Sequence, residues 1–380
     1  MSSATSRQHL ISFKKVKGNN MKFEIDKVVT AETDTERCSD LHGVPVEDME
    51  ALLHDRIVSE YRGEAWKDMR HQWGANDAKR DGDKTLSDDV EIYADLDYKT
   101  PGFKREGFGH VKEYASVQSG NISGNKSDYA SNSRFDIYKP VKPGAYPTLV
   151  NIHGGGFFYG DKEIYKFYCA DMARRGFNVV NFNYRLSPEN KYPANIEDVC
   201  ACMNYLKENA DELDLDMDKV FLTGDSAGAY LSVLYCVFAG DKKLRDKVSF
   251  ATSAVMPRAV ALNCGVYDQR EDPGSMLFWT LFNSDGSLAA EKADSVIFLD
   301  TLAYMDGTFP PAYVMVSVND DLKSKTDSLI SKFKEKNVRF TYREYGAEHP
   351  ENGHVFHIDV TNPEAVECND AEAEFFKRFI

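Results

Sequence analysis

The pentapeptide GDSAG at 224–228 has the residue types and the spacing of a serine nucleophile. An apolar strand is predicted at 219–224, directly before the serine, and an apolar helix at 227–239, directly after it. In such a strand–turn–helix corner the two glycines permit a sharp turn that exposes the serine hydroxyl. The hydroxyl of Ser226 would then lie near a helix N-terminus, where developing negative charge is favoured. The pattern predicts nucleophilic attack on a carbonyl carbon.

A second stretch, TLVNIHGGGFFYG at 148–160, reads as a buried strand followed by a histidine and three glycines. Attack on an ester carbonyl puts negative charge on its oxygen, and pre-aimed backbone N–H groups stabilise that oxyanion. We predict that Gly155, Gly156 and Ala227 supply these N–H groups, with glycine keeping side chains out of the substrate's way. His153 is interpreted as structural, its ring bonded to loop backbone. A phosphate-binding loop is disfavoured because no Lys-Ser/Thr pair follows the glycines.

A nucleophilic serine needs a base, and the base needs an orienting acid, in the chain order Ser, Asp or Glu, His. The histidines after the elbow are His349, His354 and His357. His354 follows a glycine on a predicted loop and is the favoured base, although geometry decides between the three. Asp320 and Asp321 follow a predicted strand, and either could be the acid while the other caps the next helix. Periodicity does not choose between them.

Three motifs in this order resemble the hormone-sensitive-lipase group of α/β-hydrolase carboxylesterases: HGGGFF at 153–158, NYRLSPENKYPANIEDV at 183–199, and GDSAG. The resemblance runs from about residue 147 to the C-terminus. In that family the acid occupies the first position of an Asp-x-Leu pattern, which is Asp320 here. The family's base lies in a Gly/Pro-His-x-Phe pattern, which is matched by His354. The second glycine that usually follows the elbow is replaced by Ala229.

The resemblance implies an α/β-hydrolase fold, with a mostly parallel central sheet flanked by helices and an N-terminal helical cap. It also implies a serine carboxylesterase. Aromatic crowding after the glycines places Phe157 and Phe158 in the substrate pocket and favours short acyl groups, acetyl in particular. Amide or peptide hydrolysis on the same three residues stays open as an alternative, as does a non-catalytic protein that binds a small molecule.

Strands and helices alternate through most of the chain, which indicates a mostly parallel sheet covered on both faces. We expect a mobile tail at 1–20, a helical cap region at 21–105, and a catalytic domain at 106–380 with a helical excursion at 266–309. One or two helices are predicted at 44–73 and a loop at 74–89. Strands are predicted at 109–117, 134–140, 148–153, 178–186, 219–224, 259–265, 312–319 and 339–346, and further helices at 163–175, 195–209, 227–239 and 322–335.

Composition limits the partners and the setting. The 380-residue chain carries a formal net charge of −15, which argues against nucleic acid or an anionic membrane as a partner. The longest apolar stretch is too short to span a bilayer. We expect a small-molecule ester as the partner, and the sequence leaves open a homo-oligomer.

The seven cysteines lack the spacing of a disulfide framework or a zinc site, which is typical of a reduced, cytoplasmic protein. We expect no metal and no organic cofactor, since serine chemistry needs neither. Five of the cysteines sit among apolar neighbours and are predicted to be core residues: Cys169, Cys200, Cys202, Cys236 and Cys264.

Overall fold

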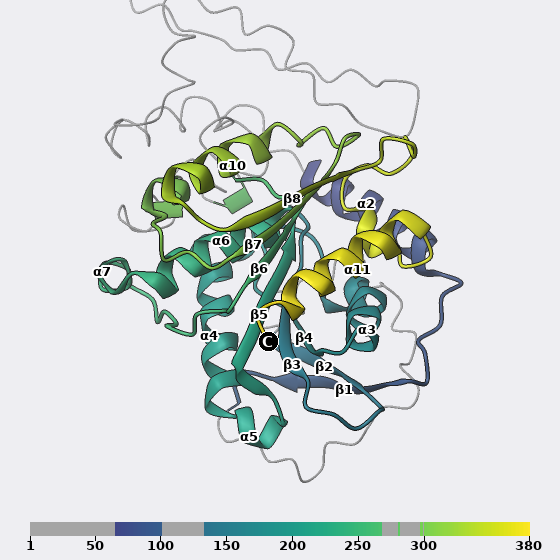
Figure 1. The fold of residues 1–380 in the computed structure, drawn as a ribbon, viewed down its shortest axis with the longest axis horizontal. Coiled ribbons are helices and arrows are strands. Elements are labelled where there is room, and N and C mark those ends of the chain that lie inside the picture. Colours follow the sequence, from purple (N-terminus) through teal and green to yellow (C-terminus); the bar gives the residue numbers. More distant parts are fainter. Residues whose placement is uncertain (1–64, 101–132, 268–279, 282–296, 299) are drawn as a thin grey trace, which may run out of the picture.

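An eight-stranded sheet organises the chain, with helices packed on both of its faces (Figure 1). The computed structural model describes residues 65–100, 133–267, 280–281, 297–298 and 300–380. The strand order is β1-β2-β4-β3-β5-β6-β7-β8. The strands are β1 Val90–Asp97, β2 Arg134–Pro140, β3 Pro147–Ile152, β4 Asn178–Phe182, β5 Asp216–Asp225, β6 Val260–Asn263, β7 Ala312–Ser317 and β8 Phe340–Tyr345.

From β4 to β8 every neighbouring pair of strands is parallel, whereas β1 and β2 join antiparallel at one edge. All residues of β3, β4, β6 and β7 are buried. Strands covered on both faces need such continuous apolar runs, which is why the sequence shows no alternation there. The predicted α/β class with a mostly parallel sheet is confirmed.

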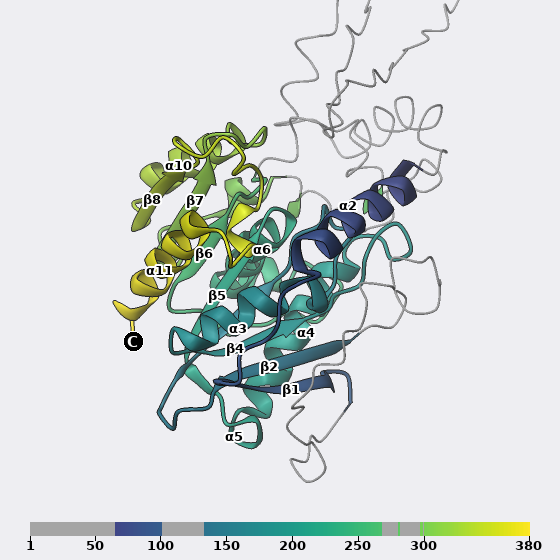
Figure 2. The ribbon, with the colours of Figure 1, turned by 90° about the vertical axis from the view of Figure 1, so that its right-hand side faces the viewer.

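The helices form two layers. Helices α3 and α11 lie on one face of the sheet, and α4 and α6 lie on the other (Figures 1 and 2). The helices and helical turns are α2 Ala65–Asp81, η2 Lys162–Tyr165, α3 Lys166–Arg174, α4 Ala194–Glu208, α5 Ala210–Leu213, α6 Ala227–Gly240, α7 Lys242–Arg245, η3 Thr301–Tyr304, α10 Lys325–Lys336, η4 Phe356–Ile358 and α11 Pro363–Lys377. Within the described ranges, none of these helices has the length and apolar character needed to cross a membrane.

The predicted loop at 74–89 is wrong in its first half, because α2 continues to Asp81. Contacts made after folding outweigh the weak helix propensity of its Gly, Asn and Asp residues. Arg80 pairs with Asp77 one turn earlier and donates to the carbonyl of Ile164. Trp73 packs on the ring of Phe158.

Strand β1 is a second difference, since it falls within the range 21–105 assigned to the cap but pairs with β2. Its residues Val90, Ile92 and Leu96 are buried, so the sheet needs this segment as an edge strand. The remaining cap prediction at 21–64, the tail at 1–20, and the strand at 109–117 lie outside the described residues. In the excursion at 266–309 the described residues 280–281 and 297–298 are helical, and the rest of that prediction lies largely outside.

The corner between β5 and α6 is built on two glycines that no other residue could replace without movement. A Cβ on Gly228 would lie 2.0 Å from the carbonyl oxygen of Ile152, at the end of β3. A Cβ on Gly224 would lie 2.6 Å from the carbonyl oxygen of Gly228. The first turn of α6 therefore rests directly on the backbone of the neighbouring strand.

We expect Gly228→Ala to lower the free energy of unfolding by about 1–3 kcal/mol or more, since backbone must shift to admit the methyl group. Gly240→Ala at the other end of α6 is the matched control, because its new Cβ meets side-chain atoms at 3.2 and 3.3 Å. Urea unfolding followed by circular dichroism measures both. Equal stability of the two variants would contradict the packing described for the corner.

Candidate active site

Ser226 occupies the turn between β5 and α6 with φ 50° and ψ −118°, a conformation that L-residues rarely adopt. Its backbone N–H donates to the carbonyl of Asn263, at the end of β6, over 2.9 Å. Strain of this kind persists only where the surroundings fix it. The hydrogen bond to the end of β6 holds the turn in place, and Ser226 is 8% exposed.

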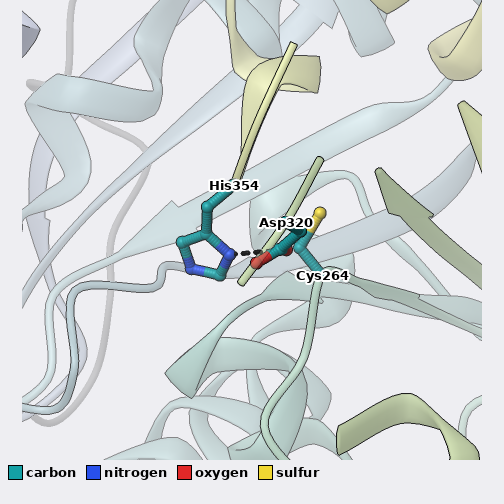
Figure 3. A group of neighbouring side chains, drawn as sticks. All are labelled: Cys264, Asp320 and His354. Atoms are coloured by element: carbon teal, nitrogen blue, oxygen red, sulfur yellow. Dashed lines mark hydrogen bonds and ion pairs between the residues drawn. The ribbon is translucent and has the colours of Figure 1, made fainter. Parts of the chain in front are cut away.

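The side chains of Ser226, His354 and Asp320 form one chain of hydrogen bonds. The Nε2 atom of His354 lies 3.0 Å from Oγ of Ser226, and its Nδ1 atom lies 2.8 Å from Oδ2 of Asp320. Asp320 follows β7, and His354 lies on the loop between β8 and α11, with its ring facing the carboxylate (Figure 3). Three residues that are far apart in the sequence thus meet at the carboxyl ends of parallel strands.

Asp320 is the acid that meets the histidine, whereas Asp321 is exposed. Oδ1 of Asp320 accepts from the N–H of Leu322 over 2.8 Å, so the same carboxylate begins the next turn and faces His354. Burial alone would raise the pKa of Asp320, but hydrogen bonds and charge from His354, together with the N–H of Leu322 and the thiol of Cys264, hold that pKa below its usual 3.8. Asp320 is therefore ionised at neutral pH.

Three other histidines make different contacts. His357 is buried beside the ring of Tyr168, and burial lowers its pKa to about 3. His349 is on the surface, 3.2 Å from Glu351. His153 is buried, with Nδ1 2.8 Å from the carbonyl oxygen of Gly154 and its ring stacked on Tyr184. Its structural role is confirmed.

The glycine loop after β3 needs bare backbone for its own fold. Gly155 and Gly156 have φ of 101° and 59°. A Cβ on Gly155 would lie 2.0 Å from the carbonyl oxygen of Tyr159, whose N–H donates back to the carbonyl of Gly155 over 2.8 Å. The tight turn therefore requires glycine at this position, apart from any need to keep side chains out of the substrate's path. Among the described residues, the N–H groups of Gly155 and Gly156 have no acceptor.

Helix α2 braces this loop through contacts that the sequence analysis did not foresee. The buried guanidinium of Arg70 donates to the carbonyl oxygens of Phe158 and Ser187 and pairs with both carboxylate oxygens of Glu189 at 2.7 Å. Trp73 stacks on Phe158 with ring centroids 5.1 Å apart. These partners are more than 80 residues apart in the chain, so no local pattern could have revealed them.

Phe157 and Phe158 are both buried in aromatic clusters. Phe157 meets Tyr230 and Phe298 edge to face, at centroid distances of 6.0 and 5.8 Å. Phe158 packs under Trp73, on the side of α2. The two neighbouring side chains therefore diverge, one toward α6 and the other toward the N-terminal helix.

A buried carboxylate next to the serine ties the elbow to the glycine loop. Oδ2 of Asp225 accepts from the hydroxyl of Tyr165 over 2.8 Å, and that hydroxyl accepts from the N–H of Gly154 over 3.0 Å. Burial raises the pKa of Asp225 to about 7, although hydrogen bonds from Tyr165 and Gly154 oppose the rise. The motif GDSAG held this signal, which sequence reasoning left unused.

The raised pKa of Asp225 predicts a pH-dependent stability. Between the unfolded pKa of about 3.9 and the folded value of about 7, the folded protein retains a proton that the unfolded chain has lost. The free energy of unfolding should therefore fall as pH rises through this window, by roughly 1.36 kcal/mol for each pKa unit of difference.

Asp225→Asn removes this titration, so the wild type should lose more stability than this variant between pH 5 and pH 7.5. Urea unfolding at the two pH values measures the difference. Asp321→Asn, which alters an exposed carboxylate, is the control and should keep the wild-type slope. An unchanged slope in Asp225→Asn would show that Asp225 titrates alike in both states.

Comparison with known proteins agrees with the fold. Residues 149–358 match the family model described as alpha/beta hydrolase fold. Acetyl esterases of Salmonella paratyphi B and Salmonella typhi are each 36% identical over 110 residues. These residues make up 29% of this chain and 34% of each relative, so the match spans about a third of the curated relatives' length.

Solved structures resemble the fold along most of the chain. Esterase B from Lactobacillus rhamnosis has a TM-score of 0.67 at 24% identity, covering 88% of this chain and 96% of that one. An esterase of the bacterial hormone-sensitive lipase family has a TM-score of 0.58 at 17% identity, covering 88% and 98%. Since the family model covers more than half of the chain, the protein belongs to the α/β-hydrolase fold family.

Proposed function

We propose that the protein is a serine carboxylesterase that hydrolyses small esters with short acyl groups, acetyl in particular. The single observation that carries the proposal is the unbroken chain from Ser226 Oγ through His354 to Asp320, at 3.0 and 2.8 Å. The acetyl preference draws on the similarity to the acetyl esterases of Salmonella and on the aromatic side chains beside the glycine loop.

In the first half-reaction, Ser226 Oγ bonds to the ester carbonyl carbon while its proton passes to Nε2 of His354. Asp320 accepts from the Nδ1–H group, which fixes the tautomer that leaves Nε2 free to accept. The carbon–oxygen bond to the alcohol then breaks, and His354 gives its proton to the leaving alcohol. Water repeats the sequence on the acyl-enzyme and releases the acid.

The oxyanion would be held by the N–H groups of Gly155, Gly156 and Ala227. The first two are donors without an acceptor among the described residues, and the third is in the first turn of α6. A site of this kind costs no reorganisation when charge develops, and losing one donor typically costs about 2.7–4 kcal/mol of barrier. The field at the start of α6 acts in the same direction.

We place Phe157 in the wall of the substrate pocket and Phe158 directly behind that wall, as its support. Phe157 adjoins the donors and packs with Phe298 and Tyr230, so its ring would limit the length of the acyl chain. Phe158 would act behind the wall, because it is enclosed under Trp73.

The six described cysteines are free, which supports the expected reducing, cytoplasmic setting.

Ser226→Ala should lower kcat/KM for p-nitrophenyl acetate by about 10⁴-fold or more, because no other group supplies the nucleophile. His354→Ala should lose a similar amount, and Asp320→Asn about 10³–10⁴-fold, since the imidazole would take the wrong tautomer. Initial rates under pseudo-first-order conditions measure all three.

His349→Ala and Asp321→Asn are the matched controls, one for the base and one for the acid, and both should keep near wild-type turnover. If His349 or Asp321 proved essential instead, the assignment of base or acid would be wrong. A matched anilide of the same acyl group tests the alternative amide chemistry. Faster cleavage of the anilide than of the ester would replace the esterase proposal.

The proposed pocket predicts that kcat/KM falls along a series of p-nitrophenyl esters from acetyl to octanoyl. Phe157→Leu should move the optimum toward longer acyl groups, because the smaller side chain opens the wall without adding a polar atom. Phe158→Leu is the paired control, and the optimum should stay at acetyl there. A wild-type optimum at octanoyl would contradict the short pocket.

A further inference from the structure

Cys264 was predicted as a core residue, and the structure gives it a more specific place. It directly follows β6, is 1% exposed, and has φ 48°. Its N–H donates to the carbonyl of Met315 on β7 over 2.7 Å. Because β6 and β7 are parallel, Cys264 leaves the sheet at the same edge from which Asp320 follows β7.

The cysteine completes a cluster with two residues of the candidate site. One potential ligand atom from each of Cys264, Asp320 and His354 lies within 4.8 Å of those from the other two. Figure 3 shows the carboxylate of Asp320 with the imidazole of His354 on one side and the thiol of Cys264 on the other. The ring atom that faces Asp320 is Nδ1, at 2.8 Å. A thiol, a carboxylate and an imidazole therefore lie close enough together to serve as three ligands of one metal ion.

We infer that Cys264, Asp320 and His354 form a binding site for a thiophilic divalent cation such as Zn²⁺ or Cd²⁺, and that its occupation switches the enzyme off. Thiolate, imidazole and carboxylate are the protein ligands of Zn²⁺, at about 2.0–2.3 Å from the metal. Ligands at that radius around a tetrahedral ion lie roughly 3–4 Å apart, so small side-chain movements suffice. The switching, unlike the binding, rests on the proposed function.

Charge and proton balance favour the cation in this partly buried place. The thiol of Cys264 is buried, and it must lose its proton when the sulfur becomes a ligand. On binding, the S–H bond breaks and its proton leaves to solvent, the ring proton moves from Nδ1 to Nε2 by exchange with water, and metal–sulfur and metal–nitrogen bonds form. The carboxylate of Asp320 contributes the second negative charge. A divalent ion with one thiolate and one carboxylate is neutral overall, which avoids burying net charge.

His354 determines both how the ion would reach the site and how its binding would stop hydrolysis. The side chain of His354 is 35% exposed, whereas that of Asp320 is 1% exposed, so the ion would enter from the side of the imidazole. With Nδ1 bound to the metal, the ring proton resides on Nε2, which then faces Ser226 as a donor. A histidine in that state cannot accept the serine proton, and hydrolysis stops.

The activity test titrates Zn²⁺ into p-nitrophenyl acetate assays without chelator. We expect inhibition of the wild type that EDTA reverses, and at least a 10-fold higher inhibitory concentration for Cys264→Ser, each rate being scaled to the same variant without metal. Cys236→Ser is the matched control, because Cys236 is also buried but lies on α6. Zn²⁺ should inhibit this variant as it inhibits the wild type. Equal inhibition of Cys264→Ser and the wild type would overturn the assignment.

A binding test that needs no turnover separates this inference from the proposed function. Cd²⁺ is added to Ser226→Ala protein, and thiolate-to-cadmium charge transfer is followed in the ultraviolet, with near-ultraviolet circular dichroism as the check on folding. One equivalent of Cd²⁺ should saturate the band, and Ser226→Ala/Cys264→Ser should lack it. A folded protein without the band, or a band that persists in the double variant, refutes the site. If Cd²⁺ binds as expected but the wild type has no esterase activity, only the proposed function is refuted.

Discussion

The contact between the first turn of α6 and the end of β3 is the constraint on which the site depends. Gly228 rests on the carbonyl of Ile152 so closely that a single methyl group would collide with it. This approach brings the start of α6 beside the backbone that follows β3, next to the strained turn at Ser226. The turn at Ser226 and the glycine loop after β3 therefore become neighbours through backbone contacts of the sheet.

Buried carboxyl groups stabilise the corner between β5 and α6. Asp225 joins the elbow to the glycine loop through Tyr165, as described above. Glu372 on α11 accepts from Thr223 on β5 and from Asn263 on β6, over 2.8 and 2.9 Å. Burial raises the pKa of Glu372, against the effect of these hydrogen bonds. The carboxyl of Glu372 thereby links β5, β6 and α11. It does so while buried away from water.

The sequence was sufficient where the chemistry depends on local spacing. The turn at Ser226 could be predicted from its pentapeptide, and the carboxyl ends of parallel strands bring the segments of Asp320 and His354 to one edge of the sheet. Choosing Asp320 over Asp321 required a family resemblance, because both follow the same strand. The brace by Arg70 and the place of Cys264 could not be predicted, since each depends on partners that only the folded chain brings together.

The brace has a consequence for where the catalytic unit begins. All of the groups proposed to react with the ester lie after β3, so a boundary drawn by motifs alone would discard everything before the sheet. Yet Arg70 and Trp73, on α2, hold the backbone and ring of Phe158, two residues beyond the proposed donor Gly156. A fragment that starts at β1 would keep every reacting group and lose the clamp on the loop that aims them. The smallest fragment that keeps this clamp is therefore longer than the set of motifs, and it begins with α2, which supplies none of the groups proposed to react.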